Sequence, residues 1–225
     1  MVNDMKDILI KIAISGKAQT GKDTSSNLIK LALQKNKIDV NTIAFATPIK
    51  EMLMIMFPNL NRKYVFGSSE LRSKIIPGAF DKDGNPLTIR RALLDIGTLL
   101  GRSYKDDVWL NVIDTTIKDL IKRQRKSRFL GPYNQAIIVN DLRFLNEFNY
   151  LKKKEFCLVR IKRQSNTLIN HSSETDQEQI MDNEFDFVID NNKTLKHLKS
   201  QVDDLVSNIL TNQHPDFIRI LSHNH

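Results

Sequence analysis

Short apolar runs recur along the chain and predict buried β-strands. The clearest are residues 8–15 (ILIKIAIS), 135–139 (QAIIV) and 156–161 (FCLVRI), and residues 41–46 (NTIAFA) and 185–189 (FDFVI) follow a similar pattern. Apolar runs of this length, bounded by polar residues or glycine, are typical of strands in a buried sheet. We therefore expect these segments to pair in one central sheet.

Stretches with a helical spacing of apolar residues lie between these runs. Pro48 suits the first turn of a helix over residues 49–56, and Thr194 is a suitable cap for a helix that extends to residue 209. The strongest pattern marks one helical face at Trp109, Val112, Ile113, Thr116, Ile117, Leu120 and Ile121. Further helices are expected after residue 24 and near residues 89–100 and 146–153. This alternation predicts an α/β fold with a mostly parallel sheet and helices on both faces.

Three segments do not follow this alternation. Residues 59–86 hold three of the eight glycines and two of the six prolines, which predicts loops with short helices. Residues 162–183 are polar and almost without apolar periodicity, so we expect a mobile excursion from the sheet. The tail after Ile209 carries no motif that points to a function.

Composition fits a single globular domain. The chain has 225 residues, of which 40% are hydrophobic and 27% charged. No apolar run approaches the roughly 18–20 residues that cross a membrane, and the first residues lack the layout of a signal peptide. The expected location is the cytoplasm, or the host cytoplasm if the protein is viral. The single cysteine, Cys157, lies in an apolar run, where a buried packing role is expected rather than catalysis.

The net charge of +8 is compatible with a phosphorylated ligand or with nucleic acid. The densest basic run covers residues 118–128. It fits either the solvated end of a helix or a nucleic-acid patch, and we favour the helix end because cations suit the C-terminal helix dipole.

A phosphate-binding loop follows the first predicted strand. The sequence GKAQTGKDT has the pattern G-x-x-x-x-G-K, in which glycines let the backbone N–H groups curl toward phosphate oxygens and the lysine reaches the β- and γ-phosphates. The strand before it and the helix after it are the context that this motif requires. The residues assigned to ATP binding are Gly16, Lys17, Ala18, Gln19, Thr20, Gly21, Lys22, Asp23 and Thr24.

The loop departs from the usual motif at the residue after the lysine. Asp23 stands where a serine or threonine is usual, and Thr24 comes one place later. Either residue can hold magnesium directly or through water, and the sequence leaves both open.

Further motifs follow the loop in order along the chain. They are FATPIKE (45–51), TIRRALLDIGTLLGR (88–102), NDLRFLNE (140–147), HSSE (171–174) and FVIDNNKTL (187–195). Together with the GKDT ending of the loop and with Trp109, they resemble the deoxynucleoside monophosphate kinases of tailed bacteriophages. Leu94 stands at the family's glutamine position, which bears on base or sugar discrimination, and Lys193 replaces a glycine, where we expect only a structural effect.

The resemblance implies a three-layer P-loop kinase fold that uses ATP and magnesium to phosphorylate a deoxynucleoside monophosphate. It implies one domain over residues 1–225, with a core at 7–47, 106–161 and 184–210, an acceptor-binding insertion at 48–105 and a lid at 162–183. A homodimer is expected only because relatives dimerise. No membrane partner is expected, and a nucleic-acid partner is disfavoured.

Phosphoryl transfer needs positioning and positive charge more than covalent chemistry. Arginine suits the acceptor monophosphate, which carries nearly two negative charges; the candidates are Arg90, Arg91, Arg102 and Arg143. Arg143 has the best case, because Asp141 and Arg143 follow a predicted strand at the carboxyl edge of the sheet, where ligands bind in open α/β folds. A structural ion pair is the alternative. Lys22, Asp141 and Arg143 are therefore assigned as catalytic residues.

The remaining assignments each have a structural alternative. Arg90 is preferred to its neighbour Arg91 by the motif match, Gly97 with Thr98 can instead mark a helix kink, and Trp109 can stack on a base or cap the core. The full substrate-binding set is Lys50, Arg72, Arg90, Gly97, Thr98, Trp109, Asp141, Arg143 and Glu147. The lid set is Lys162, Arg163, His171 and Glu174, whose cations would close over the phosphates.

Two other functions compete with this hypothesis. One is a kinase for another small phosphorylated acceptor, such as phosphomevalonate; Trp109 favours a base-bearing acceptor instead. The other is a non-catalytic, nucleotide-dependent protein that binds nucleic acid, for which the arginines assigned to the acceptor would have no purpose.

Overall fold

The computed structural model describes residues 7–126, 134–164, 177, 179–211 and 218–221. The chain forms two compact units, one from residues 1–44 and 116–225 and the other from residues 45–115. The predicted insertion at 48–105 lies within the second unit. Each unit is described by itself.

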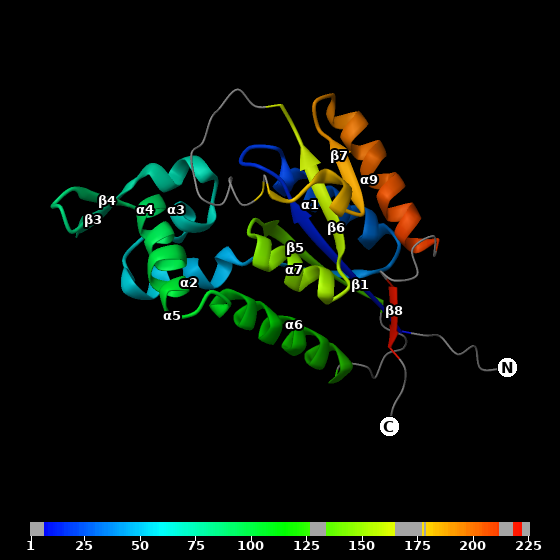
Figure 1. The fold of residues 1–225 in the computed structure, drawn as a ribbon, viewed down its shortest axis with the longest axis horizontal. Coiled ribbons are helices and arrows are strands. Elements are labelled where there is room, and N and C mark those ends of the chain that lie inside the picture. The colour runs from blue at the N-terminus through cyan, green and yellow to red at the C-terminus, as the bar shows by residue number, and fades with distance from the viewer. Residues whose placement is uncertain (1–6, 127–133, 165–176, 178, 212–217, 222–225) are drawn as a thin grey trace. The chain divides into compact units, whose positions relative to one another are not determined.

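The first unit is built on a sheet whose five parallel strands have the order β2-β5-β1-β6-β7 (Figure 1). The strands are β1 (Asp7–Ser15), β2 (Asp39–Ile43), β5 (Gln135–Leu142), β6 (Cys157–Lys162) and β7 (Phe187–Asp190). A further strand, β8 (Ile218–Leu221), pairs antiparallel with the first residues of β1, whereas β6 pairs with its last residues. The predicted mostly parallel sheet is therefore confirmed.

Helices cover both faces of this sheet. On one face, α1 (Lys22–Lys35) and α9 (Leu195–Leu210) pack against alternate residues of the strands, and the buried core there includes Ile12, Ile138 and Val159. On the opposite face lies α7 (Leu145–Lys153), which buries Phe148 and Leu151 (Figure 1). This is the three-layer α/β arrangement that the alternation of strands and helices predicted.

The second unit has its own hydrophobic core, which includes Leu53, Val65, Ile76, Ile89 and Ile96. Its elements are α2 (Ala46–Met56), α3 (Arg62–Phe66), a 3₁₀-helix at Ser69–Ser73, β3 (Ile75–Phe80), β4 (Pro86–Thr88), α4 (Ile89–Leu94), a π-helix at Asp95–Leu100 and α5 (Gly101–Tyr104). A long helix, α6 (Val108–Lys126), begins in this unit and continues into the first.

Two parts of the fold differ from the sequence prediction. The hairpin of β3 and β4 lies where loops with short helices were expected; its turn is closed by Asp81, whose carboxylate accepts from the backbone N–H groups of Asp83 and Asn85. The expected helix over residues 89–100 is α-helical only to Leu94 and then becomes a π-helix. A pattern of apolar spacing does not distinguish these two helix types over one turn.

The basic run that ends α6 fits the solvated helix end favoured from the sequence, because Lys122 and Arg123 are exposed on that helix. Among the described residues, no helix is both long enough and apolar enough to span a membrane.

The packing of α1 on the sheet predicts a sharp contrast between two leucines of that helix. Leu33 is completely buried and Leu31 is 47% exposed. We expect Leu33→Ala to lower the free energy of unfolding by about 2–5 kcal/mol, since it leaves a cavity. Leu31→Ala should change that free energy by less than about 0.5 kcal/mol. Urea denaturation followed by circular dichroism measures both, and equal losses would contradict the packing described here.

Candidate functional site

The phosphate-binding loop joins the end of β1 to the start of α1 and needs glycine at both of its ends. A Cβ on Gly16 would lie 2.6 Å from the carbonyl oxygen of Ile161 in β6, so a larger residue would push β6 away. Gly21 has a left-handed φ of +92° and immediately precedes α1. Glycine adopts this conformation without strain. Gln19 is also left-handed, with φ of +61°.

Lys22 folds back over the loop. Its Nζ donates to the carbonyl oxygens of Gly16 and Lys17, each at 2.5 Å. The Thr20 hydroxyl also donates to the Lys17 carbonyl, at 2.9 Å, and Thr20 is buried. The ammonium group is thus held at the loop itself, where a lysine in this motif meets the β- and γ-phosphates.

Asp23 and Thr24 lie in the first turn of α1, and both are exposed. Among the described residues, no group of three or more His, Cys, Asp or Glu side chains is placed to hold a metal ion. Magnesium does not need such a group, because it is commonly bound by one or two protein oxygens, phosphates and water. The buried hydroxyls of Ser15 and Ser25, at either end of the loop, lack a hydrogen-bond partner within the described part of the chain. The exposed Asp23 carboxylate and Thr24 hydroxyl, at the start of α1, are oxygen ligands of the kind that magnesium binds.

Asp141 and Arg143 lie at the carboxyl end of β5, beside the end of β1. The strand extends to Leu142, so Asp141 belongs to it, whereas the sequence placed both residues beyond the strand. Leu142 is paired with Ser15, the residue that precedes the loop. Both Asp141 and Arg143 are half-buried. The strand register therefore brings the Asp141 carboxylate and the Arg143 guanidinium to the edge of the sheet where the loop begins.

Glu147 caps the N-terminus of α7. Its side chain is 2% exposed, and Oε2 accepts from the backbone N–H groups of Arg143 at 3.0 Å and Phe144 at 3.1 Å. These bonds satisfy donors at the start of α7, as in a capping box. The structure thus favours a capping role for Glu147 over the substrate contact expected from the motif.

Three predicted acceptor-binding cations of the second unit converge on the segment of residues 66–69. Lys50 Nζ lies 5.3 Å from the centroid of the Phe66 ring, Arg72 Nη2 donates to the Gly67 carbonyl at 3.4 Å, and Arg90 Nη2 donates to the Ser69 carbonyl at 2.8 Å. Residues far apart in sequence thus contact the same short segment of the second unit. We call Lys50, Arg72 and Arg90 the basic cluster.

The other two arginine candidates of this unit bond elsewhere. Arg91 forms an ion pair with Asp95 at 2.9 Å, and Arg102 Nη1 donates to the carbonyl oxygen of Asp106 at 3.3 Å. The pairing of Arg91 with a carboxylate leaves less of its charge for a phosphate. Arg90 bonds to a neutral carbonyl and not to a carboxylate, which agrees with the preference for Arg90 over Arg91 as the ligand of the acceptor phosphate.

Trp109 and Gly97 pack together within the second unit. Trp109 Nε1 donates to the Gly97 carbonyl at 2.7 Å, and the indole is only 5% exposed. A Cβ on Gly97 would lie 2.9 Å from Cδ1 of Ile49, and Thr98 beside it is half-buried in the π-helix. The structure therefore favours the core alternative for Trp109 over stacking on a base. For Gly97 it favours close helix packing.

Described residues at the two ends of the predicted lid are joined by an ion-pair network that includes Arg160, just before the lid. Asp182 accepts from Lys162 Nζ at 2.5 Å and from Arg160 Nη1 at 2.8 Å, and Arg160 also donates to the carbonyl oxygens of Gln177 and Ile180. The bond from Lys162, followed by that from Arg160, lowers the pKa of the Asp182 carboxyl.

The sequence analysis did not name Arg160 as a residue that joins the ends of the predicted lid. Its charge inside the apolar run FCLVRI could have indicated a buried ion pair. Lys162 and Arg163, which were predicted, are exposed. His171 and Glu174 lie outside the described residues.

Cys157 is completely buried in β6, as the sequence predicted. Burial, assisted by the negative charge of Asp186, raises the pKa of the thiol well above its ordinary value. A thiol in this environment stays protonated and does not act as a nucleophile.

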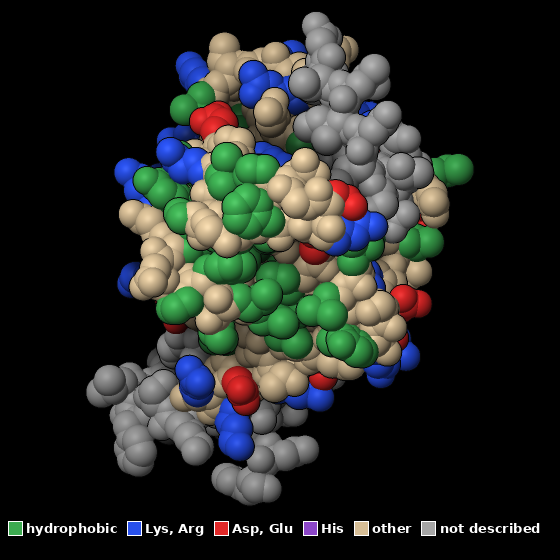
Figure 2. Space-filling view, turned by 90° about the vertical axis from the view of Figure 1, so that its left-hand side faces the viewer, with side chains coloured by type: hydrophobic (Ala, Val, Ile, Leu, Met, Phe, Trp, Pro, Cys, Tyr) green, Lys and Arg blue, Asp and Glu red, His purple; other side chains and the backbone are tan. Residues whose placement is uncertain are grey.

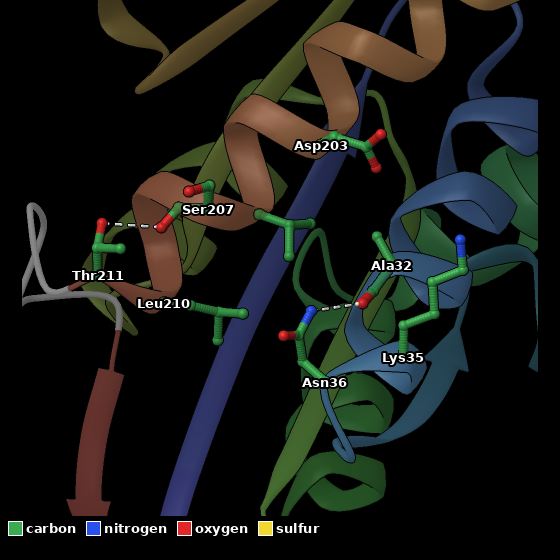
Figure 3. A pocket seen from close by; sticks show the side chains of 8 residues that line it. Ala32, Lys35, Asn36, Asp203, Ser207, Leu210 and Thr211 are labelled. Carbon is green, nitrogen blue, oxygen red and sulfur yellow. Dashed lines mark hydrogen bonds between the residues drawn. The ribbon is translucent and has the colours of Figure 1, made fainter.

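A cavity of about 330 Å³ lies between the C-terminal ends of α1 and α9 (Figure 3). Its polar side chains bond back to their own helices: Asn36 donates to the Ala32 carbonyl and Thr211 to the Ser207 carbonyl. The cavity is at the opposite end of α1 from the loop, about 20 Å away along a helix of 14 residues. It is therefore separate from the phosphate-binding site.

The chain is similar to a viral protein over most of its length, and to two solved structures at lower identity. No protein-family model matches the chain. The chain is 24% identical over 201 residues to a protein of Acanthamoeba polyphaga mimivirus named "Putative deoxynucleotide monophosphate kinase", and the match covers 89% of this chain and 97% of that protein. Among solved structures, dephospho-CoA kinase from Campylobacter jejuni matches with a TM-score of 0.48 at 12% identity, over 90% of this chain and 98% of that one. TT1252 from Thermus thermophilus matches with a TM-score of 0.40 at 16% identity, over the same shares.

The mimivirus protein confirms the resemblance that the ordered motifs predicted, because the match runs along nearly the whole chain. With its phosphate-binding loop and its parallel sheet, the chain has the features expected of an ATP-dependent P-loop phosphotransferase, and it is similar to a protein named as a kinase.

The capping geometry of Glu147 predicts different effects for two substitutions. Glu147→Gln keeps an oxygen acceptor and should leave the acceptor KM within about two-fold. Glu147→Ala leaves two buried N–H groups unbonded and should cost about 1–3 kcal/mol of unfolding free energy. Denaturation and steady-state kinetics of both variants test this. A large rise in acceptor KM for the glutamine variant, at unchanged stability, would instead show that Glu147 contacts the substrate.

Proposed function

We propose that the protein transfers the γ-phosphoryl group of ATP to a deoxynucleoside monophosphate and releases the deoxynucleoside diphosphate and ADP. The observation that carries the proposal is the convergence of Lys50, Arg72 and Arg90 in a chain that also has a phosphate-binding loop. We infer that the loop binds the donor triphosphate and that the three basic residues bind a second phosphorylated substrate. The match to a protein named as a deoxynucleotide monophosphate kinase supports the nucleotide acceptor.

The donor triphosphate is assigned to the loop. Its backbone N–H groups and the N-terminus of α1 bind the phosphates, and Lys22 balances the charge that develops between the β- and γ-phosphates. Magnesium, when bound, neutralises charge on the same phosphates. Asp23 or Thr24 is assigned to hold it, with Asp141 as a further oxygen donor at the sheet edge.

The acceptor phosphate is assigned to the basic cluster of the second unit. Arg143 of the first unit stays an acceptor ligand predicted from the sequence. A phosphate oxygen of the monophosphate attacks the γ-phosphorus, and the bond from that phosphorus to the β,γ-bridging oxygen breaks. No general base is needed, because the attacking oxygen is already ionised at neutral pH. Arginine and lysine are needed to orient this dianion and to offset its repulsion from ATP. Lys162 and Arg163 are proposed to add positive charge from the predicted lid.

The proposed setting is the cytoplasm, with small molecules as the partners. A homodimer stays a prediction. Figure 2 looks onto the second unit and shows hydrophobic side chains gathered on its surface, and exposed apolar residues of that unit include Ile55, Phe80 and Tyr104. Surfaces of this kind are common where proteins associate. Sedimentation velocity measures the oligomeric state directly.

A coupled assay of ADP release tests the function. ATP and magnesium are supplied with each deoxynucleoside monophosphate in turn, with the ribonucleotides and with phosphomevalonate. We expect turnover with at least one deoxynucleotide. Turnover with phosphomevalonate and with none of the nucleotides would show that phosphomevalonate is the acceptor. No turnover, combined with tight and steeply salt-dependent DNA binding, would identify a binding protein instead.

The assignment of Lys22 predicts a loss of transition-state stabilisation. Lys22→Ala should lower kcat by about 100-fold or more, because removing a preorganised charge of this kind costs several kcal/mol at the barrier. Lys35→Ala, at the far end of α1, is the matched control and should retain nearly full activity. Steady-state kinetics measure both variants, and full activity of Lys22→Ala would refute its role.

Arg90 and Arg91 provide an adjacent pair that tests the basic cluster. Arg90→Ala should raise the acceptor KM by about 10-fold, while the affinity for ATP stays within two- to three-fold of wild type. Arg91→Ala removes an ion pair with Asp95 on an exposed helix surface and should change both by less than about two-fold. The reverse order of effects would contradict the assignment of the acceptor phosphate to Arg90.

A further inference from the structure

The turn that follows β7 touches the phosphate-binding loop. Asn191 Nδ2 donates a 2.8 Å hydrogen bond to the carbonyl oxygen of Thr20, a residue 171 positions earlier in the chain. The same amide packs on the loop's second glycine, since a Cβ added to Gly21 would collide with Asn191 Nδ2. The contact is half-buried, and it lies wholly within the first unit.

This hydrogen bond fixes the orientation of one peptide unit of the loop. The Thr20 carbonyl and the Gly21 N–H belong to the same planar trans peptide, in which the two groups point in opposite directions. A carbonyl held toward Asn191 therefore directs the Gly21 N–H away from Asn191. Glycine gives this peptide the freedom to rotate, because Gly21 has few steric limits on φ. Without the bond, the N–H group would sample other directions.

The backbone that carries the Asn191 side chain is bonded to two neighbouring elements. Gln201 of α9 accepts from the backbone N–H of Asp190 at 3.0 Å and donates to the Asp190 carbonyl at 2.8 Å. The backbone N–H of Asn191 donates to the Lys162 carbonyl of β6 at 2.8 Å. The amide thus approaches the loop from a backbone that is bonded on both sides. Lys193 does not disturb this turn, because its φ is not left-handed and glycine is not required there.

The next residue extends the connection to the start of the predicted lid. Asn192 Oδ1 accepts from the backbone N–H of Gln164 at 2.7 Å, and Asp190 Oδ1 accepts from the Asn192 backbone and side-chain amides. One turn therefore bonds both to the loop and to residues 162–164.

We propose that Asn191 is a positioning residue for the donor triphosphate, which acts by holding the Thr20–Gly21 peptide in its phosphate-binding orientation. This inference rests on the proposed function, and it adds a residue that the motif and its resemblance left without a role. Asn191 acts through the loop. Its loss therefore affects ligands that carry β- and γ-phosphates, and it has little effect on the acceptor.

The test compares two substitutions that remove the donor in different ways. Asn191→Asp has the same shape but places a carboxylate oxygen against the Thr20 carbonyl, whereas Asn191→Ala removes the side chain without adding charge. Isothermal titration with ATP and magnesium should show affinity reduced about 10-fold for Asn191→Ala and further for Asn191→Asp. The acceptor KM, measured at saturating ATP, should stay within two-fold of wild type for the alanine variant.

A matched control separates positioning from general stability. Asn36→Ala removes the same kind of bond, from Nδ2 to the Ala32 carbonyl at 2.9 Å, at the other end of α1, and should leave ATP affinity unchanged. Hydrogen exchange of the ATP-free protein gives a second readout. The amides of residues 20–22 should exchange about 10-fold faster in Asn191→Ala, and those of β1 should not change.

The outcomes distinguish this inference from the function on which it rests. If wild-type protein does not bind ATP, the proposed function fails and the inference fails with it. If wild type binds ATP and Asn191→Ala binds equally well, only the inference is overturned. An effect of Asn191→Asp without an effect of Asn191→Ala would show added charge repulsion and would likewise overturn it.

Discussion

Backbone N–H groups bind a phosphate only if the chain holds them toward one centre, and in this protein that requirement falls on the peptides between Gly16 and Lys22. The chain meets it with conformations that most residues avoid. Gly21 is left-handed, and Gly16 lets the chain leave β1 directly beside the Ile161 carbonyl. The turn is therefore held from two sides, by β6 next to its first glycine and by Asn191 next to its last.

The sheet positions this loop through the register of its parallel strands. β1 is flanked by parallel neighbours, so its carboxyl end is fixed relative to those of β5 and β6. The same register places Asp141 and Arg143 beside the start of the loop, and Lys162 is the last residue of β6. A fold with parallel strands thus collects charged residues at one edge although they are distant in sequence.

The parts of the structure that depend on local pattern could be predicted from the sequence. The strands β1, β5 and β6 could be recognised as apolar runs because they are buried on both faces, and the loop has a recognisable sequence motif. β8 could not be predicted, because four residues in an otherwise uninterpreted tail give no periodic signal and the strand forms only by pairing with β1. The π-helix was missed because apolar spacing does not distinguish it from an α-helix over one turn. The β3–β4 hairpin was missed because the glycine and proline in this segment predicted loops.

The sequence identified which residues lie at candidate sites, but it did not predict what each of them contacts. Lys50, Arg72 and Arg90 were named singly, and only the fold shows that they share the segment at residues 66–69. Glu147 and Trp109 lie in motifs that suggest ligand contact, but burial and their backbone bonds favour structural roles. Asn191 lies in the motif FVIDNNKTL, but its role could not be predicted, because a side-chain bond to a distant backbone carbonyl has no sequence pattern.

The central claim is that the loop and the basic cluster hold the two substrates of one transfer reaction. Its most direct test is the binding of a bisubstrate analogue, in which adenosine and a deoxynucleoside are joined through five phosphates. If both sets of groups act together, the analogue should bind at least about 100-fold more tightly than ADP, because the second half binds at high effective concentration. An affinity equal to that of ADP would contradict the account.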